Sequence, residues 1–348
     1  MSDQPRIDVG LNAVIVAVTD ERPRVLTLRG PDPADPEGRA ADLLPYGPLD
    51  PGGDRTLELT LRGWVRNQAR LELGYVEQLY TFGDRGRLKG QPLEGERLGA
   101  EPSGAWPRET RPPEAQPPEG EPRTLSVAYL ALARERASRT PAGVHWQEVY
   151  AYLPWEDGRK GRPELFDRFL VPRLETWIRS AGSRRERDER RDRAAVGFGL
   201  FGSDWDGDRV LERYELLYGA GLVPEAGRDR GITSDAGDLV PGRPMGADHR
   251  RMLATALGRI RGKIRYRPVV FELVPPHFTL LQLQRVVEAL SGVRLHKQNF
   301  RRLVERGGLV EGTGDYESDT GGRPAELFRF RREVLRERRA PGVGLPGA

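Results

Sequence analysis

The chain has 348 residues, of which 37% are hydrophobic and 31% are charged. This length is enough for two domains, and no stretch approaches the ~18 consecutive apolar residues that a membrane-spanning helix needs. The sequence contains no cysteine, which excludes disulfides, thiolate zinc sites and cysteine nucleophiles. Its first residues lack the pattern of a secretory signal, so we expect a cytoplasmic protein with no membrane partner.

Positive charge is concentrated toward the C-terminal end. Residues 250–339 contain 20 Lys and Arg against 10 Asp and Glu, although the net charge of the whole chain is only +4. The rest of the chain is therefore net acidic. A basic segment on an acidic body indicates a polyanionic partner; the alternative is a solvated basic surface.

The N-terminal half shows the pattern of a sheet with one helix. Residues 7–29 predict two strands around a turn at residues 20–23, and a polar, Pro-rich loop follows to about residue 54. Apolar residues at helical spacing then predict a helix, and "YVEQLYTFG" and "TLSVAYLALA" predict two further strands. The segment between these strands, residues 85–123, is rich in Pro, Gly, Glu and Arg and predicts a disordered or loosely packed insertion.

The middle of the chain is less regular. We expect a strand in "WQEVYAYLPWED", a helix in "PELFDRFLVPRLETWI" and a charged, solvated linker over residues 179–195. Carboxylates then follow at the spacing of a calcium loop, but Arg209 stands where such a loop needs glycine. A helix start with acidic residues fits better than a calcium site. These carboxylates are Asp204, Asp206, Asp208 and Glu215.

The C-terminal third predicts three helices and a hairpin. An amphipathic basic helix begins near Asp248, and a second helix opens with a capping box of Thr279 and Gln282 and ends at Gly292. A third helix, "HKQNFRRLVERGG", has an apolar face and a polar face. A hairpin with a Gly-rich tip follows. This order is typical of a winged helix-turn-helix.

The third helix carries the residue types that recognise bases. Arginine offers paired donors to guanine, and Asn and Gln pair with adenine, whereas a wing arginine suits a phosphate or the minor groove. From the preceding basic helix we expect phosphate contacts by Arg250, Arg251, Arg259 or Lys263. The alternative is a winged helix that contacts protein. The predicted DNA-binding residues are Lys297, Gln298, Asn299, Arg301, Arg302 and, in the wing, Arg323.

The segment "YVEQLYTFGD" resembles the one that follows the catalytic helix of Nudix hydrolases, a helix that holds divalent cations with several glutamates. Aligned on Arg62, the three glutamate positions become Gly63, Arg66 and Asn67. Because a cation at such a position repels metal, we predict no catalytic residues and no metal site. The alternative is an active Nudix hydrolase, similar to ADP-ribose pyrophosphatases, that uses carboxylates outside the box, such as Glu77 or Asp84.

Six stretches together resemble the Nudix-related transcriptional regulators of NAD metabolism, the NrtR type. These are "GLNAVIVAV", "GYVEQLYTFGD", "SVAYLAL", "RPVVFELVPPHFTLLQLQRVVEAL", "LHKQNFRRLVERGGLVEGTG" and "GGRPAELFRF". The resemblance implies a repressor that binds double-stranded DNA at palindromic operators as a homodimer. It also implies a decayed Nudix domain that senses ADP-ribose or another NAD-related nucleotide.

We therefore expect an α+β protein, with a Nudix-like α/β/α sandwich followed by a winged helix-turn-helix. The expected divisions are a sensing domain over residues 1–247, a DNA-binding domain over 248–339 and a tail over 340–348. No cofactor is expected beyond the nucleotide effector. By position alone, candidate ligand contacts are Arg62, Glu77, Tyr80 and Phe82. An RNA-binding or protein-scaffold module is a further alternative.

Overall fold

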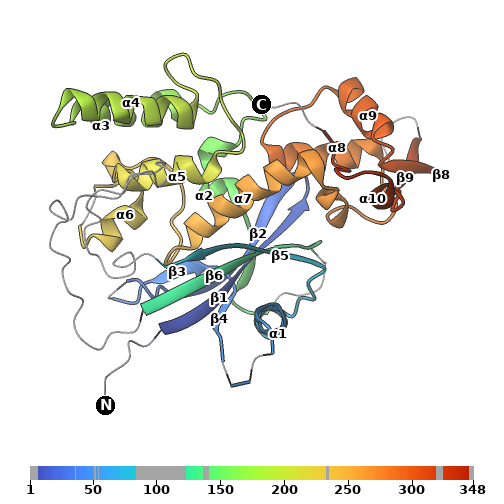
Figure 1. Ribbon diagram of the computed structural model, residues 1–348, viewed down its shortest axis with the longest axis horizontal. Coiled ribbons are helices and arrows are strands. Elements are labelled where there is room, and N and C mark those ends of the chain that lie inside the picture. The colour runs from blue at the N-terminus through green and yellow to red at the C-terminus, as the bar shows by residue number, and fades with distance from the viewer. Residues whose placement is uncertain are drawn as a thin grey trace.

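The computed structural model describes residues 7–35, 37–50, 52–53, 55–83, 123–135, 141–232, 235–318 and 324–344 (Figure 1). The insertion predicted over residues 85–123 lies outside these residues except for its last position. None of the helices in the described part of the chain is long and apolar enough to cross a membrane.

A seven-stranded mixed sheet forms the centre of the body. Its main path has the order β3-β2-β1-β6-β5, with β4 paired to β1 and β7 paired to β2. Strand β1 runs parallel to β6 and antiparallel to β2. The strands are β1 (Ile7–Thr19), β2 (Arg22–Pro31), β3 (Ala40–Leu43), β4 (Tyr46–Pro48), β5 (Tyr75–Phe82), β6 (Arg123–Leu132) and β7 (Val144–Glu148).

The strands predicted over residues 7–29 are confirmed, and their turn shows why they pair. Asp20 and Glu21 have φ values of 51° and 61°. Two such residues in a two-residue loop match the right-handed twist of a hairpin. The predicted loop to residue 54 instead contains β3 and β4, two strands too short to produce a clear periodic pattern.

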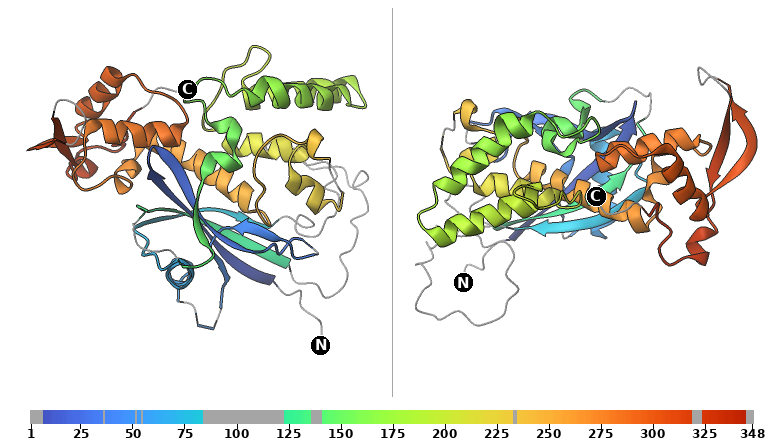
Figure 2. Two further views of the ribbon diagram at one scale, coloured as in Figure 1. Left: turned by 180° about the vertical axis from the view of Figure 1, so that it is seen from behind. Right: turned by 90° about the horizontal axis from the view of Figure 1, so that it is seen from above.

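Helices cover both faces of the sheet, so the body is the predicted α/β/α sandwich (Figures 1 and 2). Alternate residues of β1 point to opposite faces. Leu11 and Ile15 pack with Leu61 of α1 (Leu57–Ala69), whereas Val14 and Val16 belong to the core that includes Met252 of α7 (His249–Tyr266). Helix α7 is therefore a layer of the body as well as the element that leads into the winged helix.

A helical layer lies beyond α7 (Figure 1). The helix predicted over residues 163–178 is a π-helical turn, η3 (Phe166–Leu170), continued by α3 (Val171–Arg179). The charged linker predicted over residues 179–195 is wrong, because most of that segment is α4 (Arg184–Phe198). Next come α5 (Val210–Gly219) and α6 (Pro224–Asp229), and two short helices, α2 (Val149–Tyr152) and η2 (Pro154–Glu156), follow β7 earlier in the chain.

The C-terminal elements form a winged helix, as predicted. They are η5 (Val269–Glu272), α8 (Leu280–Ser291), α9 (Lys297–Arg306), β8 (Val310–Glu317), β9 (Ala325–Phe330) and α10 (Val334–Glu337). Both hydrogen bonds of the capping box between Thr279 and Gln282 form, and Gly292 ends α8 with a φ of 73°. Phe278 pairs with Phe328, which ties the start of α8 to the hairpin.

Candidate functional site

Helix α9 has one face packed on the domain and one face free. Phe300 and Val304 are 2% and 0% exposed, because they dock on α8 and the hairpin core. The outward residues named from the sequence are all exposed on α9; they are Lys297, Gln298, Asn299, Arg301 and Arg302. Arg323 lies outside the described residues.

The two arginines of this face differ in their partners. The Arg301 Nε donates to Glu305 Oε1 at 2.7 Å, so it is held in an ion pair along the helix. The Arg302 Nη2 donates to Asn299 Oδ1 at 2.7 Å, and Arg302 makes no ion pair with a carboxylate in the part of the chain that the structure describes. Arg302 therefore offers a cation to an anionic or guanine-like partner at lower cost than Arg301 does.

A buried carboxylate sets the turn between α8 and α9. Glu288 is 1% exposed, accepts from the Leu295 N–H at 3.0 Å and accepts from Arg294 Nη1 at 2.6 Å. Burial alone would raise its pKa, but these donors together with Gln284 and Arg285 hold the pKa of Glu288 below its ordinary value. The angle of α9 thus depends on a residue that sequence reasoning missed. Its neighbours at helical spacing, Gln284, Arg285 and Ser291, are polar, so the sequence pattern gave no signal that this acid is buried.

Most of the α7 cations considered for phosphate contact are turned toward the body. Of the four expected to contact phosphates, only Arg259 is exposed. That expectation is wrong for the other three, because α7 covers the sheet and its cations neutralise carboxylates of the body. The pairs are Arg250 with Glu225 at 3.1 Å, Arg251 with Glu215 at 2.6 Å and Lys263 with Glu77 at 2.6 Å.

A buried ionic cluster joins the body to the winged helix. The Glu156 side chain is fully buried and accepts from Arg213 Nε at 2.6 Å and Arg261 Nη1 at 2.5 Å. Burial by itself would raise the pKa of Glu156, and the two arginines hold it below the ordinary value. Arg261 Nε also donates to the Leu290 carbonyl at 3.0 Å, and the Tyr150 hydroxyl donates to the Ala289 carbonyl at 2.6 Å.

These last two bonds satisfy carbonyls at the C-terminal end of α8, which have no partner within their own helix. Positive charge at a helix C-terminus is also electrostatically favourable. The body therefore caps the first helix of the helix-turn-helix. The β1–β2 turn makes a second contact, because Glu21 pairs with Arg285 at 3.3 Å and lies 3.9 Å from Arg294.

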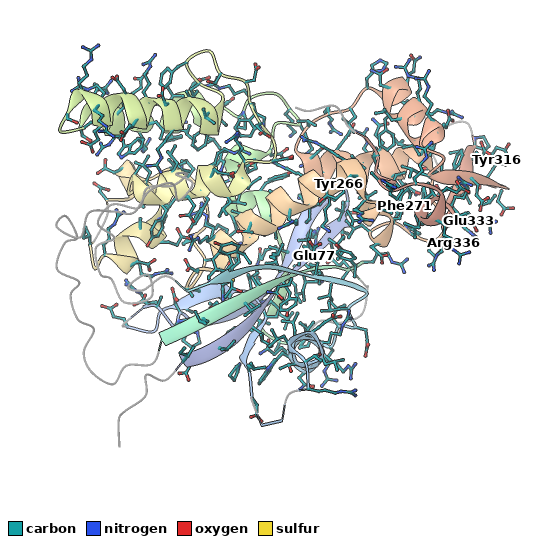
Figure 3. All side chains as sticks on the ribbon, in the orientation of Figure 1. Glu77, Tyr266, Phe271, Tyr316, Glu333 and Arg336 are labelled. Atoms are coloured by element: carbon teal, nitrogen blue, oxygen red, sulfur yellow. The ribbon has the colours of Figure 1, made fainter. Side chains whose placement is uncertain are left out.

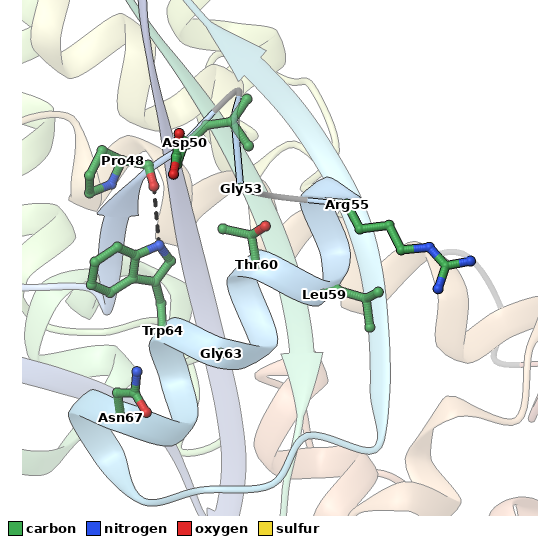
Figure 4. A pocket seen from close by; sticks show the side chains of 10 residues that line it. Pro48, Asp50, Gly53, Arg55, Leu59, Thr60, Gly63, Trp64 and Asn67 are labelled. Carbon is green, nitrogen blue, oxygen red and sulfur yellow. Dashed lines mark hydrogen bonds between the residues drawn. The ribbon is translucent and has the colours of Figure 1, made fainter.

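Two of the three Nudix-box positions line a hollow of about 450 Å³ along α1 (Figure 4). Gly63 and Asn67 line it beside Trp64, whose Nε1 donates to the Pro48 carbonyl at 3.1 Å. Gly47 gives this indole its room, since a Cβ there would lie 2.2 Å from the ring. In the part of the chain that the structure describes, no group of three or more His, Asp or Glu could hold a metal.

Of the four candidate ligand residues, the structure brings Tyr80 and Phe82 together, with ring centroids 5.3 Å apart, but not Arg62 and Glu77. Arg62 lies on α1 and donates to Glu58 and to the Gly74 carbonyl, so it ties the helix to the loop before β5. Glu77 lies on the opposite face, where Lys263 of α7 binds it (Figure 3). A bulge between residues 78 and 80 turns Phe82 into the same core as α7, and Tyr80 is 59% exposed. None of the four lines the hollow beside Trp64.

Comparison with known proteins addresses the C-terminal domain directly. Residues 270–330 match the model of the NrtR DNA-binding winged helix domain. Over these residues the C-terminal domain is similar to the winged helix of NrtR-type proteins. The ADPR-responsive transcriptional repressor NtrR of Acinetobacter baylyi is 42% identical over 83 residues, which cover 24% of this chain and 33% of that protein. The chain thus matches about a third of the length of this relative.

The whole chain shares its fold with Shewanella oneidensis NrtR. The crystal structure of that protein complexed with a 27mer DNA aligns with a TM-score of 0.50 and 17% identity, over 94% of this chain and 95% of that one. The structure of Shewanella NrtR by itself gives a TM-score of 0.50 and 18% identity over the same shares. The predicted resemblance to NrtR-type regulators is confirmed in the winged helix sequence and in the fold of the whole chain.

Proposed function

We propose that the protein is a DNA-binding transcriptional repressor of NAD metabolism genes. Its Nudix-like body binds ADP-ribose or a related nucleotide as the effector. The observation that carries this proposal is the exposed polar face of α9 within an NrtR-type winged helix. Asn299 and Arg302 stand one helical turn apart on that face and are matched in type to adenine and guanine.

The ADPR-responsive repressor from Acinetobacter supports the choice of effector. In this chain, the hollow beside Trp64 is the candidate binding site for this effector. An indole offers a stacking surface to a base, and Asn67 and Thr60 offer polar groups to a sugar or a phosphate.

We propose that the body does not hydrolyse this nucleotide. Arg66 pairs with Glu72 at 3.0 Å, so a cation occupies one former metal position. The alternative, an active Nudix hydrolase, would need another carboxylate to hold its metal. Glu77 is paired with Lys263, and Asp84 lies outside the described residues. Incubation with ADP-ribose and magnesium tests this point. Release of AMP that a chelator abolishes would favour the hydrolase.

We further propose that the protein acts as a homodimer on a palindromic operator, because two-fold proteins match two-fold sites. The effector then acts by preferring one dimer geometry over another, and a coupling of ~1–3 kcal/mol is enough. Light scattering of the protein free and on DNA tests the dimer. A monomer in both states would contradict it.

The division of the chain follows from the contacts of α7. Our sequence-based boundary at residue 248 assigned this helix to the winged helix, whereas its apolar face packs in the core shared with the sheet. We propose that the sensing body extends through α7 and that the DNA-binding domain begins near residue 270, where the family match also begins. The cluster around Glu156 then lies at the domain junction, where it would transmit a movement of the body to α8.

The test of the DNA-binding function is a titration with the duplex upstream of the protein's own gene and with a scrambled duplex. A marked preference for the first duplex supports the proposal. Equal affinity for both would favour a non-specific role, and preference for RNA or for neither would favour one of the alternative modules. If the winged helix binds a protein instead of DNA, the titration would likewise show no preference between the two duplexes.

A further inference from the structure

A group of exposed arginines lies at the C-terminal end of α9. Arg306 is in the last turn of that helix, and the segment after the hairpin, residues 331–339, carries five arginines and two glutamates. Arg306, Arg332, Arg336 and Arg339 are exposed. None of these four has an ion-pair partner among the residues that the structure describes. We call these four residues the α10 arginine group.

The segment is held against α9 by its other residues. Val334 is fully buried in the core, and the Arg338 Nη2 donates to the Arg306 carbonyl at 3.0 Å. Arg331 donates to the Gly308 carbonyl at 2.9 Å and also pairs with Glu337. The anchoring contacts therefore use Val334, Arg331 and Arg338 and leave the α10 arginine group free.

The negative charges nearby are few. Glu337 is neutralised by Arg331, Glu305 by Arg301, and Glu311 by Arg329. Glu333 is the carboxylate of the segment without such a pair among the described residues, and it lies beside Arg336 at the same end of the molecule as Tyr316 of the wing (Figure 3). The group therefore keeps a net positive charge after every ion pair is counted.

The group also lies where a DNA backbone would pass. Helix α9 has 10 residues and is about 15 Å long, whereas the major groove is ≈ 12 Å wide. Asn299, Arg302 and Arg306 follow one another at intervals of one turn along a single face. When the first two contact base edges, the end of the helix reaches the groove rim, where phosphates run.

From this arrangement we infer that the α10 arginine group is a phosphate-binding surface that extends the DNA interface beyond the recognition helix and the wing. This inference rests on the proposed DNA-binding function. The group lies at the groove rim, where phosphates run, and not over the base edges, so its contribution is independent of sequence. It would make the phosphate contacts that the sequence had assigned to cations of α7, three of which are paired with carboxylates of the body.

The test uses the full-length protein and a pool of random-sequence duplexes, with binding followed by fluorescence anisotropy at several salt concentrations. The variant is Arg332→Gln/Arg336→Gln/Arg339→Gln. The control is Arg184→Gln/Arg185→Gln/Arg187→Gln, which removes equal charge from the exposed start of α4, far from α9 (Figure 1). Each lost phosphate contact lowers the slope of log K against log salt by about 0.9. We expect the variant to lose about two to three units of slope and the control to keep the parent slope.

Equal slopes for the two triple variants would overturn the inference while leaving the proposed function intact. No duplex binding by the parent protein would overturn both. Arg336→Gln alone, with an expected loss of about 0.9 in slope, serves if the triple variant fails to give the parent's circular dichroism spectrum. An unchanged slope for that folded single variant would also contradict the inference.

Discussion

Replacement of Glu156 by glutamine tests the ionic cluster at the junction. The substitution keeps the shape of the side chain and removes its charge, which leaves the buried guanidinium groups of Arg213 and Arg261 without a counter-charge. Their remaining acceptors are neutral carbonyls, such as those of Asp206 and Leu290. Breaking a buried pair by removing one partner costs about 3–5 kcal/mol. Two arginines depend on this one carboxylate, so we expect a loss in that range.

The assay is urea unfolding at pH 7, with Glu164→Gln as the control. Glu164 is exposed and makes no ion pair among the described residues, so its change should stay within about 0.5 kcal/mol. Because the pKa of Glu156 is lowered in the folded protein, its stabilising effect is present above the ordinary value of 4.5 and is lost as the pH falls below it. The difference between parent and variant should therefore shrink in acid. A loss under about 1 kcal/mol at pH 7 would refute the reasoning.

Three further predictions concern single residues. Burial lowers the pKa of His249 to about 4 from 6.5, so the neutral side chain contributes stability above pH 6.5, and this contribution falls by about 3 kcal/mol toward pH 4. His249→Asn should flatten this part of the curve of unfolding free energy against pH. A curve identical to that of the parent would contradict the prediction. Gly292→Ala places a Cβ 2.3 Å from the Glu156 carbonyl oxygen at a residue with a φ of 73°, and it should lower the free energy of unfolding by at least about 2 kcal/mol. The control Gly231→Ala has a φ of 65° but open space around the Cβ, so its loss should be smaller. Equal losses in denaturation would show that α8 is not packed tightly at Gly292. Arg302→Ala should weaken the binding free energy by about 1–3 kcal/mol on the operator and by less on scrambled DNA. The same change at the ion-paired Arg301 should have a smaller effect. Equal losses on both duplexes would mean that Arg302 does not contact bases.

Local signals in the sequence predicted the winged helix well. Thr279, Gln282 and Gly292 fix the ends of α8 through hydrogen bonds to residues three or four positions away. Because these hydrogen bonds are local, the sequence pattern is enough to predict them. Helix α4 was missed because its first ten residues are all charged, so that contacts such as Arg190 with Glu186 at 2.6 Å and with the Trp177 carbonyl leave no periodic apolar pattern. Only Ala194, Gly197 and Phe198 bury its end, which is too short a pattern to distinguish from a linker.

The misassigned charges of α7 have a different cause. Arg250 and Lys263 find partners in Glu225 and Glu77, and the second pair joins residues 186 positions apart. The number of charges along the sequence does not show which of them form ion pairs in the folded protein. The face of the sheet that receives Phe82 was likewise not readable from the sequence, because the bulge in β5 decides it and periodicity gives no sign of the bulge.

Binding of the upstream duplex, measured with and without ADP-ribose and in the presence of a chelator, tests the central claim most directly. We expect tight, sequence-selective binding that ADP-ribose changes by about 5- to 150-fold without magnesium and without release of AMP. Selective binding that ADP-ribose leaves unchanged, or that changes only while the nucleotide is hydrolysed, would contradict the account of a metal-free sensor coupled to a winged helix.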